Sequence, residues 1–196
     1  MKQFKGKAIV MPKGKAAEYA KFSCNFYVGC SNGCEYCYLK KVPLKKTMGG
    51  DVPTLKKCFK NEAHALEVFE KELLQNLPEL QKYGLFFTFT SDPMLPETIK
   101  LTTKAVMMCV GHKVPVKILT KRADWFIPVT DDYHNENLYK VIWGEIMHDT
   151  LLFGSEFYYE FGAEDIWYEL RNYVAIGFTL TGEDKLEPTQ APTPSA

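Results

Sequence analysis

The sequence predicts an α/β fold in which about four strand–helix units form an incomplete barrel or an open parallel sheet. Residues 85–90 are rich in aromatic and β-branched side chains, which indicates a buried strand. A helix then opens at Pro96 and Glu97 and ends at Gly111, and residues 114–119 follow as another buried strand. A strand, a helix and a strand at this spacing form a βαβ unit. The strands of such a unit are parallel, and the loops at their carboxyl ends bind ligands.

The remaining predicted elements extend this pattern on both sides. Residues 25–29 are a short apolar run that ends at a Gly-Cys turn, which predicts a strand leading into a cysteine-rich loop. Apolar residues then recur at helical spacing, and Pro78 is expected to end or kink that helix. These apolar positions are Ala63, Leu66, Phe69, Leu73 and Leu77. Residues 174–180 predict a fourth strand.

One domain is expected over residues 1–196, incomplete at its carboxyl end because the chain stops after the fourth strand. Residues 122–172 interrupt the pattern with all three Trp residues and with 11 acidic against three basic side chains. They are predicted to form a helical insertion. Residues 187–196 contain three Pro residues and are predicted to be an extended tail.

Composition narrows the classes of protein. A chain with 46% hydrophobic and 24% charged residues is ordinary for a globular domain, which excludes a disordered or collagen-like protein. No segment resembles an export signal or a membrane span, so a soluble, cytoplasmic protein that does not bind membranes is expected. In that compartment the six Cys residues are expected to be reduced thiols, available to a metal.

The cysteine-rich loop is the most informative stretch. Cys30, Cys34 and Cys37 follow a C-x3-C-x2-C spacing within eight residues. A [4Fe-4S] cluster usually takes four Cys ligands, so three thiolates would leave one iron open to another ligand. Structural zinc is the alternative, since thiolates also bind zinc. The fourth zinc ligand would come from Cys24, Cys58 or His64, although Cys24, Cys58 and Cys109 are expected to be ordinary packed or incidental thiols.

Three motifs occur together. They are a Y-x-G-C-x3-C-x-Y-C-Y loop over residues 27–38, a T-S-D-P run over residues 90–93 with Glu97 after it, and Thr120-Lys121 at the end of the third strand. In combination they resemble radical S-adenosylmethionine enzymes, and within that superfamily the spore photoproduct lyase-like (DNA repair photolyase-like) branch. The resemblance covers most of residues 20–121 and 173–194. It implies a partial (β/α) barrel of the radical S-adenosylmethionine type, with about four βα units present.

The resemblance also implies the chemistry. Cys30, Cys34 and Cys37 would hold a [4Fe-4S] cluster whose open iron is chelated by the amino and carboxylate groups of S-adenosylmethionine. One electron from an external donor would cleave this cofactor to methionine and a 5′-deoxyadenosyl radical, which abstracts hydrogen from a substrate. In such an enzyme the protein positions the cofactor and excludes water.

Four further residues are assigned from the first two motifs. By their match to the family, Tyr36 and Tyr38 would flank the adenine and the cluster, and Ser91 and Asp92 would contact the methionine amine. For Ser91 and Asp92 there is a simpler alternative, since a Ser-Asp-Pro run also forms the turn that precedes a helix.

Two more residues are assigned at the ends of later strands. Lys121 matches the position that meets the cofactor carboxylate, where a cation is physically sensible. A solvated surface charge is the alternative for this Lys. Thr179 is the candidate for a contact with the ribose hydroxyls, and Thr181 is the second choice.

The chain departs from the family's pattern in two places. Phe89 stands where the lyase has a Cys that donates hydrogen, so lyase activity is not expected, the substrate is open and no catalytic residue is assigned. The fifth and sixth barrel strands are missing. An exposed parallel edge would favour association, so a partner chain that completes the barrel is expected.

Nucleic acid is a candidate substrate. Seven Lys residues lie within residues 40–60, against one acidic residue. Such a patch suits phosphate contacts, and a solvated, Lys-rich loop is the alternative. The Lys residues are Lys40, Lys41, Lys45, Lys46, Lys56, Lys57 and Lys60.

Two other functions are carried alongside the radical enzyme. One is a non-catalytic, zinc-stabilised binding module, which would bind one zinc and lose its fold on chelation. The other is a truncated remnant that binds the cluster but does not turn over.

Overall fold

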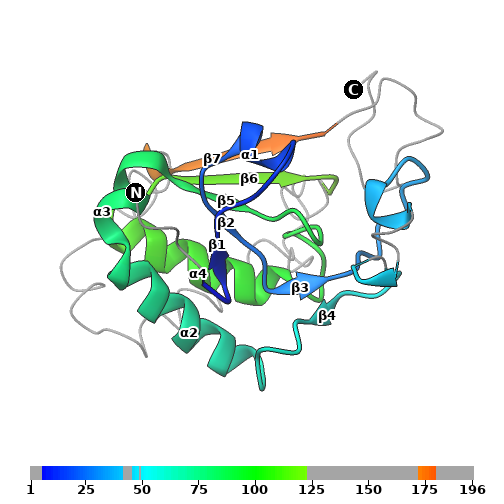
Figure 1. Ribbon diagram of the computed structural model, residues 1–196, viewed down its shortest axis with the longest axis horizontal. Helices are drawn as coiled ribbons and strands as arrows, with labels where there is room; N and C mark the ends of the chain where they lie inside the picture. Colours follow the sequence, from blue (N-terminus) through cyan, green and yellow to red (C-terminus); the bar gives the residue numbers. More distant parts are fainter. Residues whose placement is uncertain (1–5, 42–45, 49, 123–171, 180–196) are drawn as a thin grey trace, which may run out of the picture.

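A mostly parallel sheet organises the protein. The computed structural model describes residues 6–41, 46–48, 50–122 and 172–179, and these contain a five-stranded sheet of order β1-β2-β5-β6-β7 (Figure 1). β1 is antiparallel to β2, and the other neighbouring strands are parallel. The strands are β1 (Ile9–Val10), β2 (Ser23–Cys24), β5 (Leu85–Phe87), β6 (Val116–Thr120) and β7 (Val174–Phe178). The predicted α/β class is confirmed.

The other elements surround this sheet. A second sheet pairs β3 (Tyr27–Val28) with β4 (Thr54–Leu55) in antiparallel register. The helices are α1 (Ala16–Tyr19), α2 (Glu62–Gln75), α3 (Leu77–Tyr83) and α4 (Ile99–Gly111), with a 3-10 turn η1 (Tyr38–Lys40). In Figure 1, α2, α3 and α4 cover one face of the large sheet and the short α1 lies over the other.

The predicted strand at residues 25–29 is present in part, as Tyr27–Val28 before the cysteine loop, but it does not belong to the parallel sheet. The strand of the large sheet is β2, which ends at Cys24, and residues 27–28 instead pair with β4 in the second sheet. The physical reason is the buried Asn25, whose Oδ1 accepts hydrogen bonds from the backbone N–H of Phe89 and the hydroxyl of Thr88, at 2.7 and 2.9 Å. These contacts separate the two short strands and also stop β5 at Phe87, three residues before its predicted end.

The later strands are confirmed with shifted ends. β6 begins at Val116 because the backbone N–H of Val114 is bonded to Cys109 O at 2.8 Å, in the turn that closes α4. β7 ends at Phe178, two residues before the predicted end. The predicted insertion at 122–172 lies almost wholly outside the described residues, and the predicted tail at 187–196 lies wholly outside them.

The predicted break at Pro78 is confirmed. α2 ends at Gln75, and α3 begins at Leu77 with Pro78 in its first turn. α2 begins after Asn61, whose Oδ1 accepts from the backbone N–H of His64 at 2.8 Å. The predicted end of α4 at Gly111 is also confirmed, although this helix begins at Ile99 rather than at Pro96.

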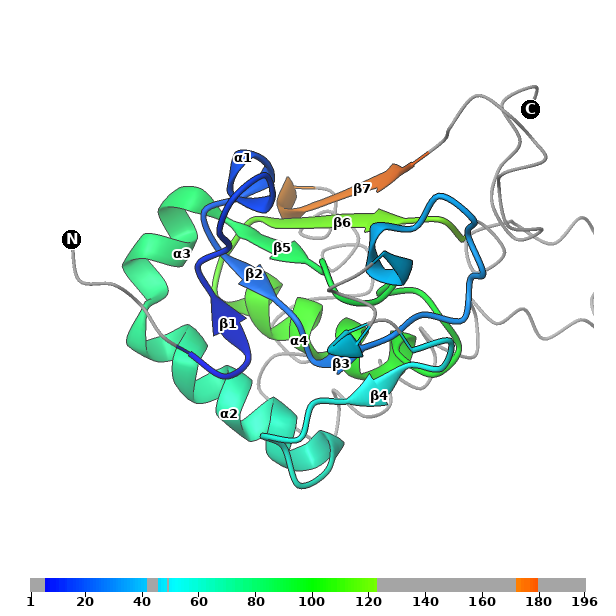
Figure 2. The ribbon, with the colours of Figure 1, turned by 45° about the vertical axis from the view of Figure 1, so that its right-hand side comes forward.

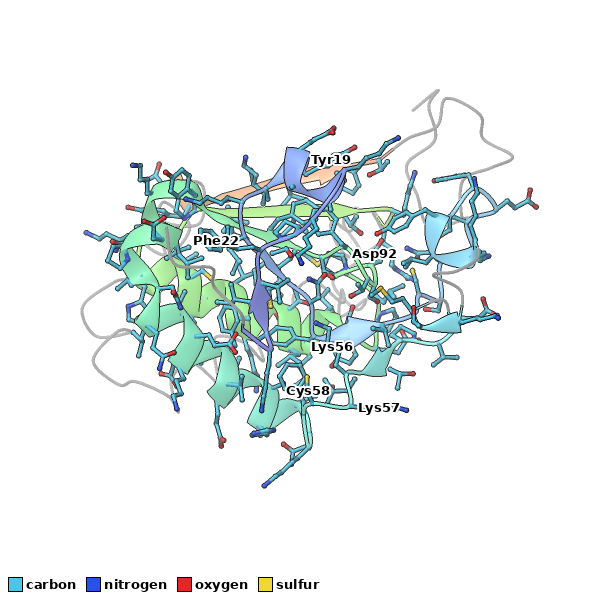
Figure 3. The ribbon with its side chains drawn as sticks, viewed as in Figure 1. Tyr19, Phe22, Lys56, Lys57, Cys58 and Asp92 are labelled. Carbon is cyan, nitrogen blue, oxygen red and sulfur yellow. The ribbon has the colours of Figure 1, made fainter. Side chains whose placement is uncertain are left out.

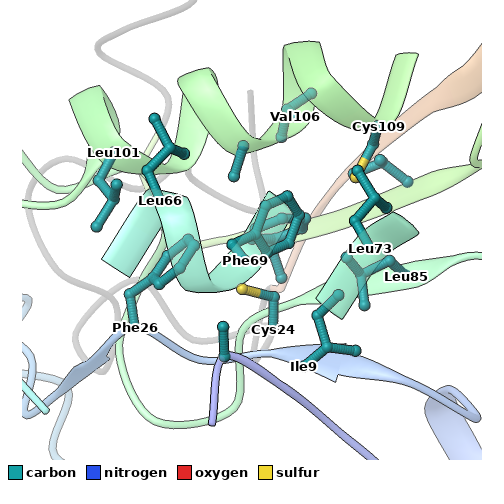
Figure 4. Packing of buried hydrophobic residues seen from close by; sticks show 14 of the residues in the cluster. Ile9, Cys24, Phe26, Leu66, Phe69, Leu73, Leu85, Leu101, Val106 and Cys109 are labelled. Carbon is teal, nitrogen blue, oxygen red and sulfur yellow. The ribbon is translucent and has the colours of Figure 1, made fainter. Parts of the chain in front are cut away.

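The core lies between the large sheet and the helices α2 and α4 (Figure 4). Phe69 of α2 is fully buried at its centre, with its ring 5.6 Å from that of Phe26 and 6.2 Å from that of Phe87. Cys24 and Cys109 are also buried in this core, as predicted for ordinary packed thiols. Truncation of a buried Phe typically costs about 3–5 kcal/mol, so Phe69 is a main contributor to the fold.

The order of the parallel strands decides where a site can form. β2, β5, β6 and β7 are neighbours in the same order as in the chain, and each pair is parallel. Their carboxyl ends therefore meet at one edge. In Figure 2 the arrows of β6 and β7 point toward the side where the loop after β3 lies. Loops from distant parts of the sequence therefore converge at this edge.

Candidate metal and cofactor site

A glycine places the cysteine loop against its neighbour. Gly29 has φ +86°, and a Cβ atom there would lie 2.6 Å from Val52 O and 2.9 Å from Gly50 O. Only Gly tolerates both the backbone conformation and this close approach. The backbone N–H of Cys30 then donates to Gly50 O at 2.9 Å, which fixes the start of the loop.

The three Cys residues of the loop are half-buried and form no disulfide. The N–H of Cys37 donates to Cys34 O at 3.3 Å, and the N–H of Lys40 donates to Cys37 O at 3.1 Å, which leads the loop into η1. Burial raises the pKa of the Cys30 thiol to about 11 and also raises the pKa of Cys34. Because metals bind thiolates, occupation of this loop would release protons.

The donor chemistry of the loop fits a soft metal or an iron–sulfur cluster, whereas the thiols are not gathered into a finished centre. Within the described residues, no three His, Cys, Asp or Glu side chains stand in a geometry that could hold a metal ion. Three free thiols on one glycine-containing turn are nevertheless the ligand type that zinc and iron–sulfur clusters take.

Asp92 connects the loop to the ends of two strands. Its Oδ2 accepts hydrogen bonds from Asn32 Nδ2 at 2.7 Å and from the backbone N–H of Lys121 at 2.8 Å. Its Oδ1 accepts from the hydroxyl of Thr120 at 2.7 Å and from the N–H of Met94 at 2.9 Å. The carboxylate therefore links the cysteine loop, the turn after β5 and the end of β6.

The predicted turn role of Ser91 and Asp92 and the predicted ligand role are both compatible with this arrangement. The bond from Met94 to Asp92 is the side-chain bond of such a turn. The hydroxyl of Ser91, by contrast, is buried and has no hydrogen-bond partner within the described part of the chain. Asn32 Oδ1 is likewise buried and without a hydrogen-bond partner among the described residues. Two unpartnered buried oxygens thus flank Asp92, and buried polar atoms normally have partners.

Lys121 is buried at this edge, with 9% of its surface exposed, so the alternative of a solvated surface charge is wrong. Its Nζ lies 4.8 Å from the centre of the Tyr36 ring and donates to the carbonyl of Thr179. The N–H of Thr179 in turn donates to Thr120 O at 3.2 Å. The contact of Thr179 with Lys121 is made by its backbone, and its side chain is exposed.

Tyr38 directly follows the last Cys of the loop, and its hydroxyl donates to Phe89 O. Partial burial and the charges of Cys37 and Cys30 raise the pKa of Tyr38 to about 12. The loop is therefore held to the segment after β5 by Tyr38 as well as by Asn32. Of the residues predicted for the site, all lie in this loop or after β5, β6 and β7. Thr181 lies outside the described residues.

Sequence reasoning did not identify Asn32 or Thr120 as contacts of Asp92. Asn32 stands between two of the Cys residues and before Gly33, which has φ +75°, so it reads as an ordinary turn residue. Thr120 belongs to the third motif but was assigned no contact. Their hydrogen bonds join residues 28 and 60 positions apart, and no local pattern carries that information.

The Lys-rich stretch is divided in space. Lys56 is partly buried, and burial lowers its pKa, while Lys57 and Lys60 are exposed. Figure 3 shows Lys56, Lys57 and Cys58 toward the lower edge of the molecule, apart from Asp92. Lys40 is half-buried and donates to Gly33 O at 3.0 Å, which places it on the cysteine loop itself. Lys45 lies outside the described residues.

No helix among the described residues is long and apolar enough to span a membrane. In comparisons with known proteins, the chain matches no protein-family model, no curated protein and no solved structure.

Proposed function

We propose that the chain is a radical S-adenosylmethionine enzyme, or the amino-terminal part of one, which binds a [4Fe-4S] cluster through Cys30, Cys34 and Cys37. One observation carries the proposal. Hydrogen bonds bring the cysteine loop to the carboxyl edge of a parallel sheet, beside the buried Asp92 and Lys121. Sites of α/β proteins lie at this edge.

The strand order supports the barrel type of this proposal. The parallel strands β2, β5, β6 and β7 follow one another in chain order, with α2, α3 and α4 on one face. A doubly wound sheet reverses its strand order and carries the helices that connect its parallel strands on both faces, whereas a (β/α) barrel keeps the chain order and carries these connecting helices on one face. A partial (β/α) barrel of the radical S-adenosylmethionine type is therefore the architecture that we propose.

The residues would divide the work as follows. When bound, the cluster supplies the electron, received from an external donor, that splits S-adenosylmethionine into methionine and a 5′-deoxyadenosyl radical. The Nζ of Lys121 offers a buried cation for the cofactor carboxylate, and the unpartnered hydroxyl of Ser91 offers a hydrogen bond to its amine. Tyr36 and Tyr38 would flank the cofactor, and Thr179 would contact its ribose.

Anaerobic reconstitution with iron and sulfide tests the proposal. We expect a [4Fe-4S] electron paramagnetic resonance signal in the reduced protein that changes on addition of S-adenosylmethionine, followed by formation of 5′-deoxyadenosine under reducing conditions. Cys58→Ala, the control for substitution of a loop Cys residue, should leave these results unchanged, since Cys58 is an exposed free thiol outside the loop. Colourless protein with one bound zinc would contradict the proposal. A cluster without 5′-deoxyadenosine would indicate a remnant that does not turn over.

Nucleic acid is the substrate class that we propose for this enzyme. The exposed Lys41, Lys46, Lys57 and Lys60 support it, because phosphate contacts by Lys dominate such binding. Fluorescence anisotropy with single-stranded and double-stranded DNA and RNA, measured over a range of salt concentrations, tests it. We expect the double substitution Lys57→Glu with Lys60→Glu to weaken binding and to flatten its salt dependence. Unchanged binding would contradict the assignment.

A partner chain would complete the barrel at β7 in this proposal. β7 is the last strand of the sheet within the described residues, and its Ile176 and Phe178 are 40% and 36% exposed. Sedimentation of the purified chain tests for association. Ile176→Lys should reduce association if this edge is used.

A further inference from the structure

The contact between Asn32 and Asp92 suggests a role that none of the motifs predicts. Asn32 lies two residues after Cys30 and two before Cys34, at the middle of the turn that joins the two thiols. Its Nδ2 donates to Asp92 Oδ2 at 2.7 Å, and both residues are more than nine-tenths buried. This bond joins the middle of the metal-binding turn to a rigid part of the fold.

The orientation of the Asn32 amide follows from the chemistry of its partner. A carboxylate only accepts hydrogen bonds, so the amide nitrogen must face Asp92 and the amide oxygen must face elsewhere. That oxygen is buried and has no partner among the described residues. The Asn32 side chain is therefore held by its nitrogen alone, and its oxygen is left without a hydrogen bond. An unpaired buried oxygen lowers stability, so the stability of the loop by itself would not favour this arrangement.

Asp92 is itself held from three other directions. The Lys121 N–H, the Thr120 hydroxyl and the Met94 N–H fix its carboxylate relative to the ends of β5 and β6. Without Asn32, both oxygens of this carboxylate would keep donors at the strand ends, Lys121 N–H on Oδ2 and Thr120 and Met94 on Oδ1, so Asp92 stays in place and Asn32 is fixed against it. The strand ends therefore determine where the turn between Cys30 and Cys34 lies.

We infer that Asn32 and Asp92 act together as positioning residues for the three thiols, holding the cysteine turn so that a metal or cluster binds it. This inference rests on one part of the proposed function, namely that the cysteine loop binds a metal. Groups that orient metal ligands typically change affinity about 10–100-fold when they are removed. Asp92, in this view, acts on the thiols through Asn32.

Titration of the reduced protein with Co²⁺, followed through thiolate-to-cobalt absorption, tests the inference. We expect Asn32→Ala and Asp92→Ala, which each remove one partner of the bond, to weaken Co²⁺ binding about tenfold or more. Because both residues act through one bond, the double variant should bind no more weakly than the weaker single variant. Asn32→Ala should keep the native unfolding midpoint, since it removes an unpartnered oxygen together with the bond.

Glu72→Ala is the matched control for loss of a buried carboxylate. Glu72 is also buried and accepts hydrogen bonds, but these come from residues 7–9 and not from the cysteine loop. This variant should bind Co²⁺ within about twofold of the native protein. Native affinity in Asn32→Ala, or losses that simply multiply in the double variant, would overturn the inference.

A second measurement keeps the inference testable if the native protein does not take up Co²⁺. Iodoacetamide alkylation, read by peptide mass spectrometry, should label Cys30 and Cys34 several-fold faster in Asn32→Ala, with the exposed Cys58 as internal reference. Equal rates would overturn the inference. If the Co²⁺ results are as expected but reconstitution yields no cluster or no response to S-adenosylmethionine, the proposed function fails and the positioning role stands.

Discussion

Two buried carboxylates, Glu72 in α2 and Asp92 after β5, differ in the number of chain segments that donate hydrogen bonds to them. Glu72 accepts from the backbone N–H groups of three successive residues, Lys7, Ala8 and Ile9, at 2.6, 3.1 and 2.8 Å. All of its donors belong to one segment. The bonds hold β1 beside β2 and cover that edge of the sheet.

Asp92 collects its donors from three segments and from both backbone and side chains. Asn32 comes from the cysteine loop, Met94 from the turn after β5, and Thr120 and Lys121 from the end of β6. A carboxylate with donors from one segment fixes the place of that segment. A carboxylate with donors from several segments fixes their positions relative to one another, which is what a binding site requires.

The largest expected effect on metal binding comes from removing a thiol that Asp92 helps to position. Cys34→Ala should abolish measurable Co²⁺ and iron uptake, because only two of the three thiols of the loop would remain. The free energy of unfolding should change by less than about 1 kcal/mol, since Cys34 is only half-buried. Metal analysis and urea unfolding measure the two effects. Uptake equal to that of Cys58→Ala would show that the metal binds elsewhere.

Substitution of Glu72 is expected to have the opposite result, a loss of stability with metal binding unchanged. Glu72→Ala leaves three N–H groups without their acceptor and should lower the free energy of unfolding by about 3–5 kcal/mol. Metal binding by the protein that remains folded should be unchanged, because none of these donors touches the cysteine loop. Urea unfolding and Co²⁺ titration at low temperature check both parts. A loss of stability below about 1 kcal/mol would contradict the role of Glu72.

A smaller effect on the same side is expected at Gly6. A Cβ atom there would lie 2.1 Å from Ile9 O and 2.4 Å from Glu72 Oε2, so the segment must shift away from Glu72. Gly6→Ala should therefore lower the free energy of unfolding by about 1–3 kcal/mol and leave Co²⁺ affinity unchanged. Native stability in thermal and urea unfolding would show that the segment is less tightly held than its contacts indicate.

The smallest expected effect concerns one donor to Asp92. Thr120→Val removes a hydroxyl that donates to Asp92 at 2.7 Å, and should lower the free energy of unfolding by about 1 kcal/mol. Co²⁺ affinity should fall less than in Asn32→Ala, because the bond from Asn32 remains. Thr103→Val is the matched control, since the buried Thr103 hydroxyl donates within α4, to Ile99 O at 2.7 Å. It should leave Co²⁺ affinity unchanged, and a larger loss there than at Thr120 would oppose the comparison.

Much of the fold could be predicted, because burial leaves a local pattern in the sequence. The run at residues 85–87, the helical spacing of Leu66, Phe69 and Leu73, and the break at Pro78 all record which side chains face the core. The same spacing misplaced Ala63, which is exposed while Ala65 is buried. It also gave no sign of Glu72, because a charged residue on a buried helix face is explained only by the segment that it binds.

The sequence by itself determined the alternation of strands and helices and put Cys30, Cys34, Cys37, Ser91, Asp92 and Lys121 in loops that follow strands. Only the tertiary structure decided that β2 and not residues 25–29 joins the large sheet, and that Asp92 contacts Asn32. The physical reason is range. Periodicity reports the surroundings of neighbouring residues, whereas a hydrogen bond between residues 60 positions apart exists only once strand pairing has brought their loops to one edge.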